Sequence, residues 1–81
     1  MEYERFKQEL RRAQLSNRAF AALLRLNPNS ISNYKSSGVV PSHLGVIATL
    51  MGAMKEAGLD YESAIASIPI ETNAARGRSL R

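Results

Sequence analysis

The chain has 81 residues, 44% of them hydrophobic, which suffices for one small domain with a single modest core. It contains no cysteine, which excludes a disulfide framework and a thiolate metal site, and no apolar run long enough to cross a membrane. We read no secretory signal in it and therefore expect a cytoplasmic protein, and the formal net charge of +4 favours an anionic partner.

The first predicted helix covers residues 2–13, where apolar side chains recur at intervals of three and four. This stripe consists of Tyr3, Phe6, Leu10 and Ala13. Acidic residues near the start of the helix and Arg11 and Arg12 near its end suit the helix dipole. The two arginines are interpreted either as solvated residues at a helix terminus or as phosphate contacts.

Two short helices are predicted next, over residues 17–24 and from Pro28 to about Lys35. Ser16 is a good N-cap for the first helix and Asn27 for the second. Pro28 suits a first helical position, because its φ is already helical and its missing amide would be unpaired there anyway. The earlier helix carries an apolar stripe of Phe20, Ala21, Leu23 and Leu24.

The helix that starts at Pro28 has few large apolar side chains and is otherwise polar. The apolar ones are Ile31 and Tyr34, with Leu26 just before the helix, and Gly38 is placed to end it. A helix that buries so little surface is usually displayed for contact with a partner.

No carboxylate occurs between Glu9 and Glu56, although this interval contains six basic residues. These are Arg11, Arg12, Arg18, Arg25, Lys35 and Lys55. The solvated face of an ordinary helical domain mixes both signs of charge. The interval therefore predicts an uncompensated positive surface that attracts a phosphate backbone.

A fourth helix is predicted from Ser42 to about Ala57, with Gly58 ending it. Its expected apolar side consists of Leu44, Ile47, Leu50, Met51 and Met54. Gly45 and Gly52 lie seven residues apart inside this helix, where each costs about 1 kcal/mol relative to alanine. They suggest close approach of another helix, which is either the first helix or part of a second subunit.

A fifth helix is predicted over residues 61–67, capped by Asp60 and stopped by Pro69. Its apolar edge consists of Tyr61, Ile65 and Ile68. This edge either closes the core or forms a dimer interface, and the two roles are compatible. Residues 71–81 are basic and lack periodicity, so we expect a disordered tail after a single domain over residues 1–70.

The segment from Ser16 to Gly38, SNRAFAALLRLNPNSISNYKSSG, resembles the helix-turn-helix of the lambda-repressor-like, or XRE-type, family of phage, plasmid and bacterial regulators. With Asn17 as the first motif position, Ala21 supplies the family's fifth-position alanine. The buried apolar positions of the motif match Phe20, Leu24, Leu26, Ile31 and Tyr34, and its common ending is echoed by Ser32, Tyr34, Gly38 and Pro41. The resemblance covers roughly residues 10–51.

The sequence departs from the family pattern at two places. Arg25 stands where the family usually has glycine in the turn, so the backbone there is expected to be left-handed or the turn slightly different. Lys35 follows Tyr34 with no glutamate one residue later, where a glutamate is frequent, which makes the motif more basic than is typical.

The resemblance implies a compact, all-α, five-helix domain whose second and third helices form the helix-turn-helix. It implies a transcriptional regulator, more often a repressor, that binds an inverted-repeat operator as a homodimer and regulates its own operon, as small phage and plasmid control proteins do. An activator or the antitoxin of a toxin pair remains open.

In that mode of binding the helix from Pro28 to Lys35 enters the major groove of double-stranded DNA. The expected base contacts are Asn29 and Asn33, with Ser30, Ser32 and Pro28. The expected phosphate contacts are Asn17, Arg18, Asn27, Tyr34, Lys35, Ser36 and Ser37. An asparagine amide can donate to N7 of adenine and accept from its N6 at once, and residues four apart share a helix face.

Catalysis is poorly supported by the sequence. His43 is the only histidine, and no glycine-rich phosphate loop or metal-ligand cluster accompanies it, so we expect no enzyme activity, cofactor, metal or small-molecule ligand. The competing hypothesis is a protein-interaction module that uses the exposed polar helix and the face of Gly45 and Gly52. An RNA-binding role is disfavoured, because the aromatic residues belong mostly to apolar stripes.

Overall fold

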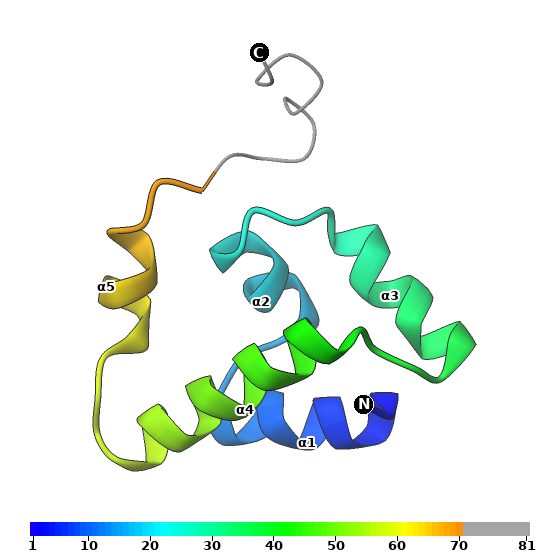
Figure 1. Cartoon of the computed structure of the whole chain (residues 1–81), viewed down its shortest axis with the longest axis horizontal. Helices are drawn as coiled ribbons and strands as arrows, with labels where there is room; N and C mark the ends of the chain where they lie inside the picture. The colour runs from blue at the N-terminus through cyan, green and yellow to red at the C-terminus, as the bar shows by residue number, and fades with distance from the viewer. Residues whose placement is uncertain (71–81) are drawn as a thin grey trace.

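The computed structural model describes residues 1–70, which form five α-helices and no strand (Figure 1). The helices are α1 (Tyr3–Ala13), α2 (Asn17–Leu23), α3 (Pro28–Ser37), α4 (Ser42–Glu56) and α5 (Tyr61–Ala66). The all-α class is confirmed, and every helix boundary lies within two residues of its predicted position. The predicted tail, residues 71–81, lies outside the described residues.

Three of the helices begin with the side-chain caps that the sequence predicted. Ser16 Oγ accepts a hydrogen bond from the Ala19 amide at 3.0 Å at the start of α2. Asn27 Oδ1 accepts from the Asn29 amide at 2.8 Å at the start of α3. Asp60 caps α5 in the same way, and each cap satisfies an amide that has no partner inside its helix.

The core lies between the α1–α4 pair and the shorter helices that cover it (Figure 1). The apolar stripe predicted for α1 is buried along its whole length. Phe6 of α1 meets Phe20 of α2 edge to face, with ring centroids 5.2 Å apart. The largest fully buried side chains are Phe6, Phe20, Leu10, Ile31 and Val40. No helix within residues 1–70 is long and apolar enough to cross a membrane.

The two glycines of α4 allow close approach of α1 and of Met1 at the start of the chain. A Cβ atom on Gly52 would lie 3.1 Å from Arg12 Cβ and 3.2 Å from the Glu9 carbonyl oxygen. A Cβ atom on Gly45 would lie 3.1 Å from Met1 Cβ. Both glycines are buried inside the subunit. The alternative that their face contacts a second subunit is therefore wrong.

The seam that α4 presents to α1 consists of Leu44, Gly45, Ala48, Met51 and Gly52. Leu50, expected on the apolar side of the helix, is instead 58% exposed. Its neighbour Met51 faces the core, and successive helix residues point about 100° apart, so Leu50 is turned out of the seam. The buried side of α4 thus combines the large side chains of Leu44 and Met51 with the small residues Gly45, Ala48 and Gly52.

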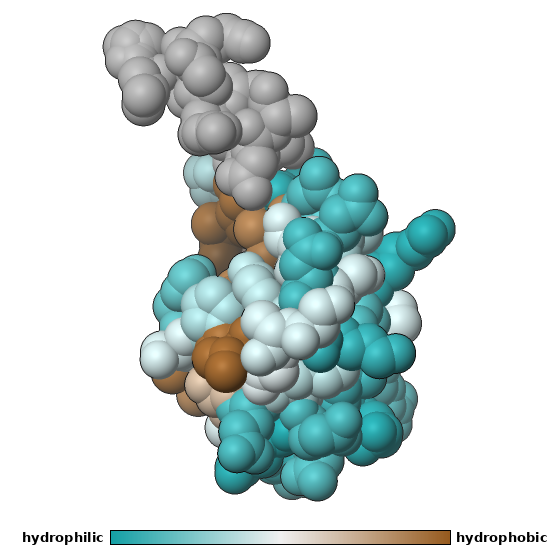
Figure 2. Space-filling view, turned by 90° about the vertical axis from the view of Figure 1, so that its right-hand side faces the viewer, coloured by the Kyte–Doolittle hydropathy of each residue, from teal (hydrophilic) through white to brown (hydrophobic). Residues whose placement is uncertain are grey.

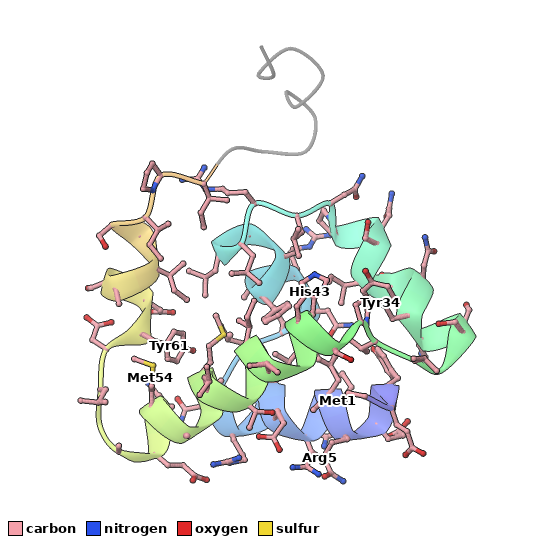
Figure 3. The ribbon with its side chains drawn as sticks, in the orientation of Figure 1. Met1, Arg5, Tyr34, His43, Met54 and Tyr61 are labelled. Atoms are coloured by element: carbon pink, nitrogen blue, oxygen red, sulfur yellow. The ribbon has the colours of Figure 1, made fainter. Side chains whose placement is uncertain are left out.

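Tyr61 of α5 is part of the core and is only 4% exposed. Its hydroxyl donates to the Ala13 carbonyl oxygen at 2.6 Å, and its ring points from α5 towards α4, near Met54 (Figure 3). Burial raises the pKa of this hydroxyl, and the charge of Glu62 acts in the same direction. The prediction of Tyr61 as a dimer contact is corrected, because its ring is enclosed within one subunit.

The start of the chain is joined to the loop between α3 and α4. The Val40 amide donates to the Met1 carbonyl oxygen at 2.7 Å, and the Tyr3 amide donates to the Gly38 carbonyl oxygen at 3.0 Å. Glu2 and Val39 form an isolated antiparallel bridge between these bonds. The C-terminal end of α3 is thereby fixed to the body of the domain.

Candidate nucleic-acid interface

α3 displays a polar face that the rest of the domain leaves open. Ile31 is the only buried residue of this helix, while Asn29, Ser32 and Asn33 are exposed. The side chains of these three residues make no hydrogen bond to any other residue within positions 1–70. Figure 2 looks onto the side of the molecule where α3 lies, and this side is mostly hydrophilic.

The remaining polar residues of α3 differ in how available they are. Ser30 is half-buried, whereas Pro28 and Ser36 are exposed. The Ser37 hydroxyl donates to the Tyr34 carbonyl oxygen at 3.3 Å and belongs to the C-terminal cap, which Gly38 completes with a φ of 81°. Tyr34 itself is half-buried and packs against the core, as expected from its apolar position.

The turn between α2 and α3 contains a non-glycine residue in the left-handed region. Arg25 has a φ of 58° and is exposed. The next amide, of Leu26, donates to the Ala21 carbonyl oxygen at 2.8 Å, which secures the end of α2. The sequence left two possibilities for Arg25, a left-handed backbone or a slightly different turn. The structure has the left-handed backbone.

The charged residues of the described chain separate into paired and unpaired groups. Glu9 is only 3% exposed and accepts hydrogen bonds from Arg5 Nε, at 2.8 Å, and from Arg12. Arg12 also pairs with Glu56 at 2.8 Å. Glu9 and Glu56, which border the interval without carboxylates, are therefore both neutralised where α1 packs against α4.

Hydrogen bonding from Arg5 holds the pKa of Glu9 below its ordinary value, although burial acts against this. Hydrogen bonding to Arg12 likewise lowers the pKa of Glu56. The interpretation of Arg12 as a phosphate contact is corrected, because its guanidinium is occupied by two carboxylates. Arg11 is exposed.

Arg18, Arg25 and Lys35 belong to the second group. All three are exposed, and none takes part in an ion pair within residues 1–70. They lie on α2, on the turn before α3 and on α3 itself, so the α2–α3 segment carries positive charge without an ion-pair partner. Such an arrangement attracts a polyanion.

Asn17, expected as a phosphate contact, is half-buried, and its side-chain amide is hydrogen-bonded within the domain. Its Oδ1 accepts from Lys7 Nζ at 2.9 Å, and its Nδ2 donates to the Tyr3 hydroxyl at 2.9 Å. The side chain thus ties the start of α2 to α1. The sequence carried no signal for this role, because the partners lie ten and fourteen residues away.

The expected dimer residues of α5 do not form one continuous exposed edge. Ile65 is half-buried against the core and Ile68 is 53% exposed, while Tyr61 lies inside. His43 is exposed in the first turn of α4 (Figure 3). Within residues 1–70 no group of three or more histidine, aspartate or glutamate side chains is arranged to hold a metal ion.

No protein-family model, no curated protein and no solved structure matches this chain. The features of the chain that bear on its function are the geometry of α3 and the distribution of charge around it.

Proposed function

We propose that the protein is a sequence-specific double-stranded DNA-binding regulator of the lambda-repressor-like helix-turn-helix type, acting as a repressor. In this proposal α2 and α3 form the helix-turn-helix, and α3 lies in the major groove with its N-terminal residues towards the base edges. Asn29 and Asn33 read bases, assisted by Pro28, Ser30 and Ser32. Autoregulation of its own operon is part of the same proposal.

The observation that carries the proposal is the open polar face of α3 together with the cations beside it. The side-chain amides of Asn29 and Asn33 have no partner among the described residues, and they stand four residues apart on one helix face. Polar side chains that are buried in a protein core are normally hydrogen-bonded there. These side chains are exposed and unpaired, so this face fits a polar ligand. The cations beside this face favour an anionic polymer as that ligand.

The residues expected to contact phosphates fall into two groups, those with exposed side chains and those engaged at the helix ends. Arg18, Lys35 and Ser36 are exposed and can reach a DNA backbone on either side of α3. Arg25, which the sequence did not single out as a contact, joins them by its position in the turn before α3. Asn17, Asn27, Tyr34 and Ser37 hold the ends of the two helices and contribute through that geometry.

A duplex-selection experiment tests this function. The protein is incubated with a random pool of double-stranded DNA, bound duplexes are sequenced, and affinity for the selected site is measured by fluorescence anisotropy at several salt concentrations. We expect an enriched motif and an affinity that falls steeply with salt, because phosphate contacts release condensed counterions. If no motif is enriched and the chain instead binds another protein independently of salt, the result would support the competing interaction module.

A further inference from the structure

Tyr3, the first residue of α1, is hydrogen-bonded to both ends of the α2–α3 pair. Its amide donates to the carbonyl oxygen of Gly38, the C-cap of α3, at 3.0 Å. Its hydroxyl accepts from Nδ2 of Asn17, the first residue of α2, at 2.9 Å. A single residue of α1 therefore holds the position where α2 begins and the position where α3 ends.

The Asn17 amide is held in one orientation by its two partners. Its Oδ1 accepts from Lys7 Nζ at 2.9 Å, and an ammonium group can only donate. The amide oxygen therefore faces Lys7, and the amide nitrogen is left to donate to the Tyr3 hydroxyl. Tyr3 and Lys7 stand four residues apart on one face of α1, so this face offers the start of α2 two matched partners.

Tyr3 is itself held in place by the core. It is 8% exposed, and the centroid of its ring lies 6.2 Å from that of Phe6. Phe6 in turn meets Phe20 of α2. A ring that is packed in this way can move little without disturbing the core, so the Tyr3 hydroxyl is a fixed point for Asn17.

The α2–α3 pair is attached to the rest of the domain by few polar contacts. α1 packs chiefly along α4, whereas α3 packs chiefly against α2 (Figure 1). Within residues 1–70, the side-chain hydrogen bonds between α1 and α2 all involve Asn17. Individual bonds therefore have a large share in fixing how the α2–α3 pair is oriented on the α1–α4 pair.

We propose that Tyr3 is a positioning residue for α3, which sets the angle at which this helix is presented to the major groove by holding Asn17 and Gly38. This role rests on the proposed DNA binding, in which side chains must lie within about 10–20° of their productive geometry to reach base edges. Asn17 then acts through its bond to Tyr3. The family resemblance implies a different role for Asn17, a direct phosphate contact.

One hydrogen bond sets the size of the expected effect. A net contribution of this kind changes the equilibrium between a productive and a rotated orientation of α3 by about three- to tenfold. Affinity for a selected duplex falls with the fraction of molecules in the productive orientation. Non-specific binding depends on neutralised phosphates and tolerates a rotated helix. Loss of positioning therefore weakens specific binding and leaves non-specific binding in place.

Tyr3→Phe tests the orientation directly, because it keeps the buried ring and removes the hydroxyl. Tyr61→Phe is the matched control, since it removes another phenol hydrogen bond, to the Ala13 carbonyl oxygen, that reaches neither α2 nor α3. Residual dipolar couplings of the backbone amides in DNA-free protein measure the orientation of α2 and α3 relative to α1 and α4. We expect this orientation to change in Tyr3→Phe and to stay as in wild type in Tyr61→Phe, with unchanged helical circular dichroism in both. An unchanged orientation in Tyr3→Phe overturns the proposal.

Fluorescence anisotropy with the selected and a random duplex gives the second readout. Tyr3→Phe and Asn17→Ala should each weaken binding to the selected duplex by about three- to tenfold, and the double variant no further, because both remove the same bond. Affinity for the random duplex should stay close to that of wild type. If Asn17→Ala weakens binding to both duplexes while Tyr3→Phe binds as wild type, Asn17 contacts a phosphate directly and the proposal is overturned. A wild type that selects no duplex, with the rotation in Tyr3→Phe still observed, refutes the proposed function and supports the control of the α3 orientation by Tyr3.

Discussion

At the scale of the residue, Arg25 holds the most unusual conformation in the candidate interface. A side chain in the left-handed region brings Cβ close to the following carbonyl oxygen, which costs roughly 1–2 kcal/mol. The chain keeps this arginine at φ 58° although glycine would fit without strain. Backbone strain of this kind concentrates at functional sites. The group that the strained backbone carries here is the Arg25 guanidinium, in the turn before α3.

Arg25→Gly should raise the free energy of unfolding by about 0.5–1 kcal/mol, because relief of strain exceeds the added backbone entropy of glycine in the unfolded chain. Urea denaturation measures this change. Gln14→Gly is the matched control, since Gln14 has a φ of 62° at the end of α1. Both changes should stabilise the fold, while only Arg25→Gly should weaken binding to duplex DNA. A destabilised Arg25→Gly variant would contradict the strain argument.

Asn33→Ala should weaken binding to the selected duplex by about 1 to 3 kcal/mol and relax the preference at one base pair per half-site. The exposed amide is removed without loss of buried surface, so helical content should not change. Gln8→Ala, which removes an exposed amide from α1, serves as control and should bind as wild type. Unaltered affinity and base preference in Asn33→Ala would remove this residue from the readers.

Arg18→Ala should lower affinity about equally for the selected and a random duplex, and it should reduce the slope of log affinity against log salt by about one unit. Lys55→Ala is the charge-matched control, because Lys55 lies at the far end of α4. Its slope should stay close to that of wild type. Identical slopes for Arg18→Ala and wild type would show that Arg18 touches no phosphate.

At the scale of the element, the α1–α4 pair depends on a buried carboxylate. Glu9 lies in the seam with Arg5 and Arg12, and the latter reaches on to Glu56. Because the pKa values of Glu9 and Glu56 are lowered in the folded state, their contribution to stability is fully present above the unfolded value of about 4.3. It is lost as the pH falls through the lower folded values.

The free energy of unfolding should therefore be nearly constant from about pH 5 to 7 and fall below about pH 4.3. Glu9→Gln should cost about 1–2 kcal/mol at pH 7 and flatten the acid dependence, because the charged partner of Arg5 is gone. Glu4→Gln, at an exposed position of α1, should leave the profile unchanged. A Glu9→Gln variant with the acid profile of wild type would contradict this account.

Local sequence signals were sufficient for the helices and their ends. The caps at Ser16, Asn27 and Asp60 use neighbours two or three residues away, so they can be recognised in the sequence. The same is true of the open face of α3, since polar residues at helical spacing leave only Ile31 to be buried.

Contacts between distant residues could not be predicted in the same way. Nothing in the sequence indicated that Glu9 lies in the interior, because its burial depends on Gly52 of α4 and on Arg12. The engagement of Asn17 with Lys7 and Tyr3 likewise depends on how α2 sits against α1. Hydropathy ranked Leu50 as a core residue, whereas the position of the α4 glycines turned it outwards.

At the scale of the whole molecule, one short reading helix contacts too few base pairs to define a unique site. We expect the homodimer that the resemblance implies to bind an inverted repeat whose half-site centres lie about 34 Å apart, one turn of DNA, or a multiple of that distance. Inserting about five base pairs between the half-sites should reduce affinity to that of a single half-site, because the second half-site turns to the opposite face of the duplex. A monomer that binds one half-site with full affinity would refute this arrangement.

The bonds between Met1 and Val40 also have a consequence for folding. They close a loop that contains α1, α2 and α3, and its two ends are 39 positions apart in the sequence. Closing such a loop costs about 3 kcal/mol of chain entropy, whereas the contacts between α2 and α3 are close in sequence and form early. We therefore expect α3 to become helical before its orientation is fixed. A substitution that loosens the buried Val40 would lower DNA affinity by reducing the fraction of molecules with α3 in place, without altering any residue of α3.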